Sequence, residues 1–230
     1  KATMNGVASA TRVRQWLGSC AVYADRRVLA LILFGFASGL PLALTFGTLS
    51  LWLAEVGVSK TTIGLFALMG APYTFKFLWA PLVDKMSIPY LTRRLGRRRG
   101  WAIVTQLALM VTIAGLGTTK PAAHAGITAV FALMVAFWSA TQDIVIDAYR
   151  VEILEERQFG AGAATIVLGY RIGMLVSGAG ALYLATYVGW LVTYGLMAVF
   201  MTVGIVTVLL NPEPKVKKSR PSADQERHMG

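Results

Sequence analysis

Long apolar stretches alternate with short polar segments along the whole chain, and they carry the first structural prediction. Six stretches each hold about 20 or more mostly apolar residues. They are residues 28–54, 61–83, 100–119, 125–148, 160–186 and 188–210. A helix of roughly 20 apolar residues crosses a bilayer, and a backbone inside lipid must pair its polar groups internally. The pattern therefore predicts an all-α integral membrane protein, a bundle of six transmembrane helices.

The polar segments at the two ends predict a three-part organisation. Residues 1–27 form a basic arm, residues 28–210 the bundle, and residues 211–230 a polar tail. The tail, "NPEPKVKKSRPSADQERHMG", is charged and broken by proline, which is typical of a disordered linker. The first apolar stretch is too long for the core of a signal peptide, so we expect a retained span. Because the chain opens at Lys1 and not at methionine, we expect a piece of a longer protein.

Composition supports a membrane location, and the placement of charge predicts an orientation. Hydrophobic residues make up 56% of the chain and charged residues 14%, against about 25% charged in a typical soluble domain. Of the 22 lysines and arginines, 18 fall in the terminal segments and in the loops after the second and fourth stretches. Basic loops stay on the cytoplasmic side, so both ends are expected there. The net charge of +11 thus reflects topology and does not indicate a nucleic-acid partner.

The reactive residues argue against several classes of protein. A single cysteine, Cys20, excludes an internal disulfide and a cysteine-rich metal site. The two histidines, His124 and His228, are far apart and have no metal motif around them. The apolar stretches contain no serine triad and no phosphate-binding loop. We therefore expect no enzyme activity, no cofactor and no metal site.

Four charged residues fall inside the apolar stretches. A charged side chain at the centre of a membrane helix costs about 2.5–3.5 kcal/mol on insertion scales, so such residues usually face a bundle interior and have partners. These four are Lys76, Asp143, Asp147 and Arg171. On the predicted topology they lie between the cytoplasmic surface and the middle of the membrane. We predict that the two acids and two bases converge in this half of the bundle.

The segment "SATQDIVIDAYR" carries a polar stripe along one helix. Ser139, Asp143, Asp147 and Arg150 fall within an arc of about 80° at 100° per residue. The ordinary interpretation of Asp147 is a helix end at the water interface. For Asp143, a structural ion pair with a cation of a neighbouring span and a proton or substrate relay both stay open. Both can hold, because burial favours the neutral acid and a nearby cation favours the charged one.

Side chains near these charges are candidates for substrate contacts. The guanidinium of Arg171 offers a planar fork that suits a carboxylate. Tyr73 and Trp79 lie three residues on either side of Lys76, where rings stack on sugars but also serve in ordinary packing. The full candidate set for substrate binding or proton coupling is Asp143, Arg171, Lys76, Asp147, Gln142, Tyr73, Trp79 and Tyr170.

Small residues and prolines inside the stretches predict close packing and bends. Glycines four residues apart occur in "GFASGLPLAL" and in "LGYRIGMLVSGAGA". They are Gly35, Gly39, Gly169 and Gly173. Small residues at this spacing let helices approach closely. Pro41 and Pro72 should bend the first two helices, as in transporter helices that move, although plain tight packing accounts for the same residues.

The loop after the second stretch resembles a motif of the major facilitator superfamily of transporters. That motif reads Gly-x-x-x-Asp-Arg/Lys-x-Gly-Arg/Lys-Arg/Lys and has a gating role. The residues that resemble its two ends are Asp84, Lys85, Gly96, Arg97 and Arg98. Alanine replaces the motif's first glycine, and about ten extra residues split the motif, which puts the gating role in doubt. Six spans, both ends inside and a polar linker after the sixth resemble one half of such a transporter.

A closer resemblance is to the muropeptide permeases of the AmpG type. The segments "LILFGFASGLPLALTFGTL", "FKFLWAPLVDK", "GRRRGW", "SATQDIVIDAY" and "GAGAATIVLGYRIGMLVSG" carry it. The resemblance implies proton-driven import of anhydro-muropeptides, cell-wall fragments that carry N-acetylglucosamine and anhydro-N-acetylmuramic acid, across the bacterial inner membrane. It also implies a role in cell-wall recycling and, in some bacteria, in β-lactamase induction. Acetyl-coenzyme A transporters are distant relatives, so another bulky anionic solute is the alternative substrate.

The same resemblance sets the expected partners, which are the muropeptide, protons, the lipid bilayer and a C-terminal half of the same transporter. The family has twelve or more spans, so a six-helix half should have an open face that packs against its partner half. The superfamily's antiporters carry a glycine-proline motif in their fifth helix. The fifth stretch here has no proline, which favours symport.

Overall fold

The structure is a computed structural model that describes residues 25–213, and these residues fold into helices joined by short connections. Most of the predicted arm 1–27 and of the predicted tail 211–230 lies outside the described residues. The first helical segment is continuous from Arg26 to Glu55. It consists of α2 (Arg26–Ala43), a π-helical turn (Leu44–Thr48) and α3 (Leu49–Glu55). Asp25 caps its start and accepts a hydrogen bond from the Arg27 amide at 2.8 Å.

The second predicted span, 61–83, is a series of short helices. It comprises α4 (Lys60–Phe66), α5 (Ala71–Phe75) and α6 (Ala80–Lys85), joined by 3-10 turns at Ala67–Gly70 and Lys76–Leu78. Pro72 and Pro81 lie in the first turns of α5 and α6. Proline has no N–H to bond the preceding turn, so it fits the start of a helix and interrupts the helix before it. Lys76 therefore lies in an irregular segment.

The middle of the chain forms a helix pair. After the short α7 (Leu91–Leu95) come α8 (Arg97–Thr118) and α9 (Ala125–Ile153), which pack together. α9 runs past the predicted end at residue 148, because Tyr149 and Ile153 continue its buried face. The interpretation of Asp147 as the end of this helix is therefore wrong.

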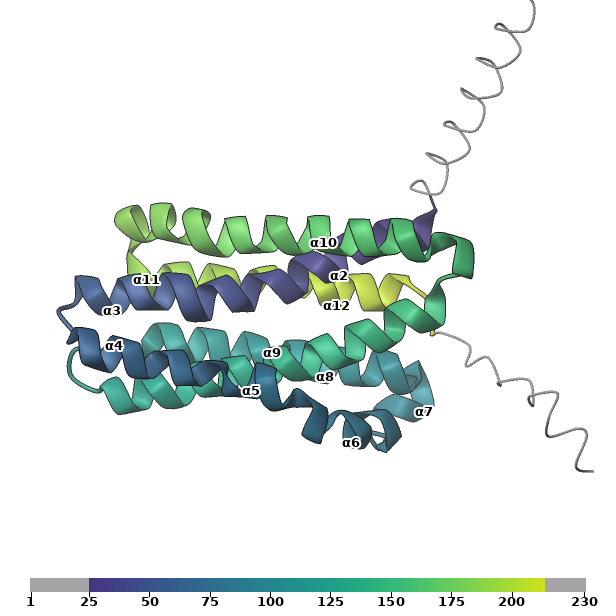
Figure 1. Ribbon diagram of the computed structural model, residues 1–230, viewed down its shortest axis with the longest axis horizontal. Helices are drawn as coiled ribbons and strands as arrows, with labels where there is room; N and C mark the ends of the chain where they lie inside the picture. Colours follow the sequence, from purple (N-terminus) through teal and green to yellow (C-terminus); the bar gives the residue numbers. More distant parts are fainter. Residues whose placement is uncertain (1–24, 214–230) are drawn as a thin grey trace, which may run out of the picture.

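The last helical segment runs from Phe159 to Leu210. It contains α10 (Phe159–Leu175), a π-helical turn (Val176–Gly180), α11 (Ala181–Phe200) and α12 (Thr202–Leu210). A straight helix of its 52 residues would be roughly 78 Å long, whereas the hydrocarbon core of a bilayer is about 30 Å thick. The chain turns back inside α11 at Gly189, whose φ of 75° favours glycine. Figure 1 shows the chain returning beneath α10 towards α12.

Four helical segments of the described residues are long and apolar enough to cross a membrane. They are Arg26–Glu55, Arg97–Thr118, Ala125–Ile153 and Phe159–Leu210. The all-helical character predicted from the sequence is confirmed for residues 25–213. The count of six spans stays a prediction, because residues 60–85 are divided among short helices and residues 159–210 form one segment that turns back.

Both ends of the described chain lie at the same end of the molecule as α6 and α7, and the connections α3–α4 and α8–α9 lie at the other end (Figure 1). The Arg26 guanidinium donates to the Leu210 carbonyl oxygen at 2.7 Å, which joins the start of α2 to the end of α12. We call this end the basic end. The basic residues of its loops and helix ends are Arg26, Arg27, Lys85, Arg93, Arg94, Arg97, Arg98, Arg99, Arg150 and Arg157. The basic segments thus gather at one end, as their order along the chain predicts.

α2 and α10 pack closely along their length. Gly35 and Gly39 of α2 and Gly169 and Gly173 of α10 lie in this contact. A Cβ atom added at any of the four would overlap a carbonyl oxygen of the opposite helix. Glycine is therefore required for the two backbones to touch.

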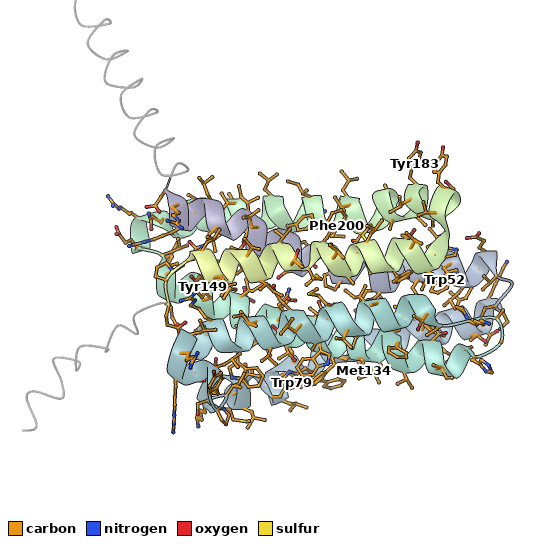
Figure 2. All side chains as sticks on the ribbon, turned by 180° about the vertical axis from the view of Figure 1, so that it is seen from behind. Trp52, Trp79, Met134, Tyr149, Tyr183 and Phe200 are labelled. Atoms are coloured by element: carbon orange, nitrogen blue, oxygen red, sulfur yellow. The ribbon has the colours of Figure 1, made fainter. Side chains whose placement is uncertain are left out.

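The buried side chains form two groups along the bundle. The group near α3 includes Leu44, Trp52, Leu109, Ile113, Tyr194 and Met197, and the group near the basic end includes Leu31, Phe34, Val145, Ile146 and Tyr149. Figure 2 shows Tyr149 near the basic end and Trp52 towards the opposite end. Large apolar side chains also cover the outside, as Tyr183 does in Figure 2. Such an outer surface fits contact with lipid or with further helices.

Candidate functional site

A cavity of about 170 Å³ lies between α2, α9 and α10. Its lining residues are Ser38, Asp143, Ile146, Asp147, Arg150, Ile166, Val167 and Tyr170. Two carboxylates and a guanidinium from one face of α9 therefore share this space with a serine of α2 and a tyrosine of α10. Three members of the predicted polar stripe, Asp143, Asp147 and Arg150, thus form one wall of the cavity, whereas Ser139 is fully buried and does not line it.

The two acids have different surroundings. The side chain of Asp147 is 55% exposed, and its carboxylate lies 3.6 Å from an Arg150 guanidinium nitrogen. Asp143 is partly buried beside Ser38. The charged groups that act electrostatically on its carboxyl group are Lys76 and Asp147. Within residues 25–213, Asp143 forms no ion pair with a lysine or arginine. Asp143 is thus the acid whose charge is not matched by a direct partner.

Arg171 lies elsewhere on α10. Tyr170 lines the cavity, and the next residue is rotated by about 100° around the helix. Arg171 is exposed and is not among the lining residues. Of the two bases predicted to converge with the acids, Lys76 lies within electrostatic reach of Asp143, whereas Arg171 does not line the cavity.

Gln142 is fully buried beside this cavity and supports α2. Its amide nitrogen donates to the Ala37 carbonyl oxygen at 3.0 Å. Ala37 lies four residues before Pro41, so Pro41, which lacks an N–H, leaves this carbonyl without its helical partner. The Gln142 side chain replaces the missing bond, and its own carbonyl oxygen has no hydrogen-bond partner in the described residues.

The remaining candidates near Lys76 differ in their contacts. Trp79 donates from its indole nitrogen to the Thr141 hydroxyl at 3.1 Å, and its ring lies 5.1 Å from that of Phe137. These contacts fit the ordinary packing interpretation of Trp79. The buried hydroxyl of Tyr73 faces Ser139, and neither group has a well-formed side-chain hydrogen bond within residues 25–213.

The two ends of the split loop motif meet at the basic end. The Arg98 guanidinium donates to Asp84 Oδ1 at 2.6 Å and to Glu152 Oε1 at 2.7 and 3.0 Å. The extra residues fold back as a loop that contains α7, and the Trp101 indole holds this loop through the Met86 carbonyl oxygen at 2.9 Å. The insertion therefore loops out without separating the two motif ends.

The other loop candidates take different positions. Lys85 is exposed, Arg97 is partly exposed, and neither forms an ion pair within residues 25–213. Gly96 has a φ of 93° and lies directly before α8. This left-handed conformation lets the chain turn from α7 into α8.

Sequence reasoning did not identify three residues of these two regions. Ser38 is hidden among the small residues of α2, which indicate packing. Glu152 follows Asp143 by nine positions, which places it about 180° around α9 and off the polar stripe. Glu213 lies after the last helix and accepts hydrogen bonds from the first turn of α8. No cluster of three or more potential metal ligands occurs within residues 25–213.

Several known proteins similar to this chain are named as permeases or transporters. A family model described as acetyl-coenzyme A transporter 1 matches residues 27–132. The anhydromuropeptide permease of Escherichia coli strain K12 is 47% identical over 194 residues, which cover 84% of this chain and 39% of that protein. Two proteins of Rickettsia typhi and Rickettsia prowazekii, named as AmpG transporters, are 35% and 36% identical over 200 residues, which cover 86% of this chain and 48% of each relative.

These similarities confirm the resemblance to muropeptide permeases that the sequence motifs indicated. The chain spans less than half the length of these curated relatives. The relatives are named as permeases or transporters. Together with the apolar helices, their names support a multi-pass membrane protein.

Proposed function

We propose that this chain forms one six-helix half of a proton-driven importer of anhydro-muropeptides in the bacterial inner membrane. The observation that carries the proposal is the cavity with Asp143, in a chain that is 47% identical to an anhydromuropeptide permease over 194 residues. The imported fragments serve cell-wall recycling, and in some bacteria their uptake contributes to β-lactamase induction. The chain itself has no enzymatic role in this proposal.

Six passes account for the helical segments. The broken series α4–α6 connects the two ends of the bundle between α3 and α8, so it acts as a second pass although no single helix in it is long (Figure 1). The reversal at Gly189 divides the last segment into a fifth and a sixth pass. Irregular backbone inside a membrane is tolerated where it packs against protein or lines a cavity, as α4–α6 would. Residues 28–210 then form the bundle, and residues 1–27 and 211–230 flank it.

The basic end faces the cytoplasm in this proposal. Most of the lysines and arginines in the connections between helices lie at this end. Lys60 and Lys120 belong to the connections at the other end. Cytoplasmic loops carry the excess of lysine and arginine. The cavity with Asp147 and Arg150 then lies in the cytoplasmic half of the membrane.

In this proposal Asp143 either carries the coupling proton or belongs to the charge network that supports proton coupling. Membrane-buried acids without a direct cation partner are rare and mark ion or proton pathways. Asp147 is more exposed and is balanced by Arg150, so its charge needs no further partner. The polar surroundings of Asp143 are completed by Lys76, Tyr73 and Tyr170. In these surroundings the Asp143 carboxyl group would alternate between its protonated and its charged form during transport.

Substrate contacts are assigned to the cavity and to the exposed face beside it. Arg150 lines the cavity, and Arg171 lies on the exposed side of α10, which the C-terminal half would cover. Arginine at such an interface suits the carboxylates of a muropeptide, because its fork binds a carboxylate through two hydrogen bonds.

The test uses the full-length carrier in inverted and right-side-out vesicles with radiolabelled anhydro-muropeptide. We expect accumulation only with an inward proton gradient, and none with Asp143→Asn at equal protein level. A protonophore should abolish accumulation by the wild type. Accumulation that is unaffected by the protonophore, or that persists in Asp143→Asn, would contradict proton coupling through this residue.

Transport of acetyl-coenzyme A is the alternative, and the family model that matches residues 27–132 favours it. Both solutes are bulky anions, so the same cavity is compatible with either. Competition separates the two functions: excess anhydro-muropeptide should block uptake of its labelled form, and excess acetyl-coenzyme A should not. The reverse result would assign the carrier to acetyl-coenzyme A.

A further inference from the structure

The first turn of α8 combines the positive end of the helix dipole with three arginines, and it contains no acidic residue to offset them. The helix begins with Arg97, Arg98 and Arg99 and has no acidic residue in its first turn. A helix N-terminus carries partial positive charge and free N–H groups, so cations there are unfavourable and an anion is stabilising. Gly96, the residue before the helix, has no side chain that can cap it.

Glu213, more than 110 positions away, supplies the missing anion. Its Oε1 accepts a hydrogen bond from the Arg98 amide at 2.9 Å, and its Oε2 accepts one from the Arg99 amide at 3.1 Å. Both carboxylate oxygens are thus used on two successive free N–H groups of the helix start. Gly96 makes room for this arrangement, because an added Cβ would overlap the Glu213 carboxylate.

The Arg98 side chain links this cap to two other helices. While its backbone amide binds Glu213, its guanidinium binds Asp84 of α6 and Glu152 of α9. Its side chain is only 10% exposed. One residue therefore ties together α6, α8, α9 and the segment that follows α12, and its position depends on where the first turn of α8 is held.

Further hydrogen bonds hold this segment and the last turn of α12 to neighbouring helices. The Arg99 guanidinium donates to the Val208 and Leu209 carbonyl oxygens at 3.0 and 3.1 Å. The Tyr149 hydroxyl donates to the Pro212 carbonyl oxygen at 2.9 Å. All of these acceptors are neutral backbone oxygens. Glu213 is therefore the residue that brings a negative charge to the start of α8.

We infer that Glu213 is a positioning residue of the basic end: it caps α8, holds Arg98 between Asp84 and Glu152, and couples the segment after α12 to the α6–α8 loop. This inference rests on the proposed carrier function only for its effect on transport. In a carrier whose second half follows α12, movement of that half pulls on the segment with Glu213. A displaced carboxylate releases the Arg98 and Arg99 amides, and Arg98 loses the position from which it reaches both acids.

Hydrogen–deuterium exchange of the full-length protein in lipid nanodiscs tests the cap directly. In the wild type, the Arg98 and Arg99 amides should exchange slowly, although amides in a first helical turn are normally free. Glu213→Gln keeps the size of the side chain, removes its charge and replaces one acceptor oxygen by an amide group. We expect exchange at both amides to rise about tenfold, and exchange in residues 82–86 and 150–154 to rise with it.

Two further variants complete the test. Glu213→Asp keeps the charge on a shorter side chain and should give an intermediate increase in exchange. Glu155→Gln is the matched control, because Glu155 pairs with Arg157 at 2.9 Å at the exposed surface of the same end. It should leave all these amides at their wild-type rates. Fast exchange of the Arg98 and Arg99 amides in the wild type would overturn the cap.

A transport assay with the same variants separates positioning from simple support of the fold. At equal levels of inserted protein, Glu213→Gln should lower the turnover rate severalfold with little change in KM, and Glu155→Gln should change neither. Acceleration of exchange confined to residues 98 and 99, with normal turnover, would overturn the coupling. Because the exchange pattern needs no substrate, it tests the inference even if the carried solute is not a muropeptide.

Discussion

The cavity around Asp143 and the network around Arg98 contain the same kinds of charged group, yet they satisfy them differently. Arg98 donates to carboxylates of two helices at 2.6–3.0 Å, and its side chain is 10% exposed. Asp143 forms no ion pair within residues 25–213, and the nearby Asp147–Arg150 pair is open to solvent at 3.6 Å. The Arg98 network thus encloses its charge in fixed ion pairs, whereas the Asp143 cavity contains an acid without a fixed partner.

The difference has a physical consequence for function. A buried cation held by two carboxylates is difficult to remove, because each released group loses its partner in a poorly solvated place. An acid that lacks a fixed partner can gain or lose a proton with smaller rearrangement of its neighbours. From this comparison we propose that the Arg98 network shapes the basic end and that Asp143 takes part in proton coupling.

The largest effect is expected from a change that separates α2 from α10, the two helices that enclose the Asp143 cavity together with α9. Gly169→Val places a branched side chain against the Ile32 carbonyl oxygen of α2 and forces α2 and α10 apart. We expect little or no correctly folded protein by size-exclusion chromatography in detergent. Gly195→Val is the matched control, because nothing lies within 4 Å of a Cβ at that position. Normal folding of Gly169→Val would show that the close helix contact is not essential.

The second effect separates the two regions. Arg98→Gln leaves Asp84 and Glu152 without their shared cation, and removal of one partner of a buried pair costs about 3–5 kcal/mol. Because Asp84 is 46% exposed, we expect the low end of that range, about 3 kcal/mol. Thermal unfolding in detergent measures it, with the exposed Arg93→Gln as control. Equal melting temperatures for the two variants would show that the network contributes no stability.

The third effect concerns Arg171, which the structure places outside the cavity. If the C-terminal half covers this side of α10, a lysine keeps the charge but loses the fork that binds a carboxylate. We expect Arg171→Lys to raise the Kd for anhydro-muropeptide about fivefold, or roughly 1 kcal/mol. Calorimetry on the full-length carrier measures it, and an unchanged Kd would exclude Arg171 from substrate binding.

The smallest effect is expected at Asp147. Exposed ion pairs three or four residues apart on a helix contribute about 0.3–0.5 kcal/mol. Asp147→Asn should therefore change the melting temperature by no more than about one degree. A loss of several degrees would mean that the pair with Arg150 is buried in the complete transporter and belongs with the closed network.

Sequence patterns predict the helical class and part of the site, for reasons that individual residues make clear. Long apolar stretches reveal helices such as α8, because burial in lipid demands both length and hydrophobicity. A spacing of four residues places Asp143 and Asp147 on one face because the helix is regular there. The same reasoning fails for residues 60–85, where Pro72 and Pro81 start new helices within one apolar stretch.

Contacts between distant segments are the part that the sequence does not reveal. Arg171 looks as buried as Asp143 along the chain, but only the rotation of α10 against α2 shows that it lies outside the cavity. In the sequence, Glu152 and Glu213 look like ordinary surface acids. In the folded chain, the packing of α9 against α8 places Glu152 beside the Arg98 guanidinium, and the end of α12 places Glu213 beside the Arg98 amide. Such pairings depend on how helices pack, which a single sequence does not encode locally.

The most direct test of the central claim compares Asp143→Asn with Asp147→Asn in the full-length carrier. Uptake of labelled anhydro-muropeptide is measured in vesicles at several external pH values, with equal amounts of inserted protein. The contrast between the two acids predicts that Asp143→Asn abolishes gradient-driven accumulation and removes its pH dependence. Asp147→Asn should keep the wild-type pH profile at a somewhat lower amplitude. Equal, pH-independent losses in both variants would show that the two acids have the same structural role and would contradict the account.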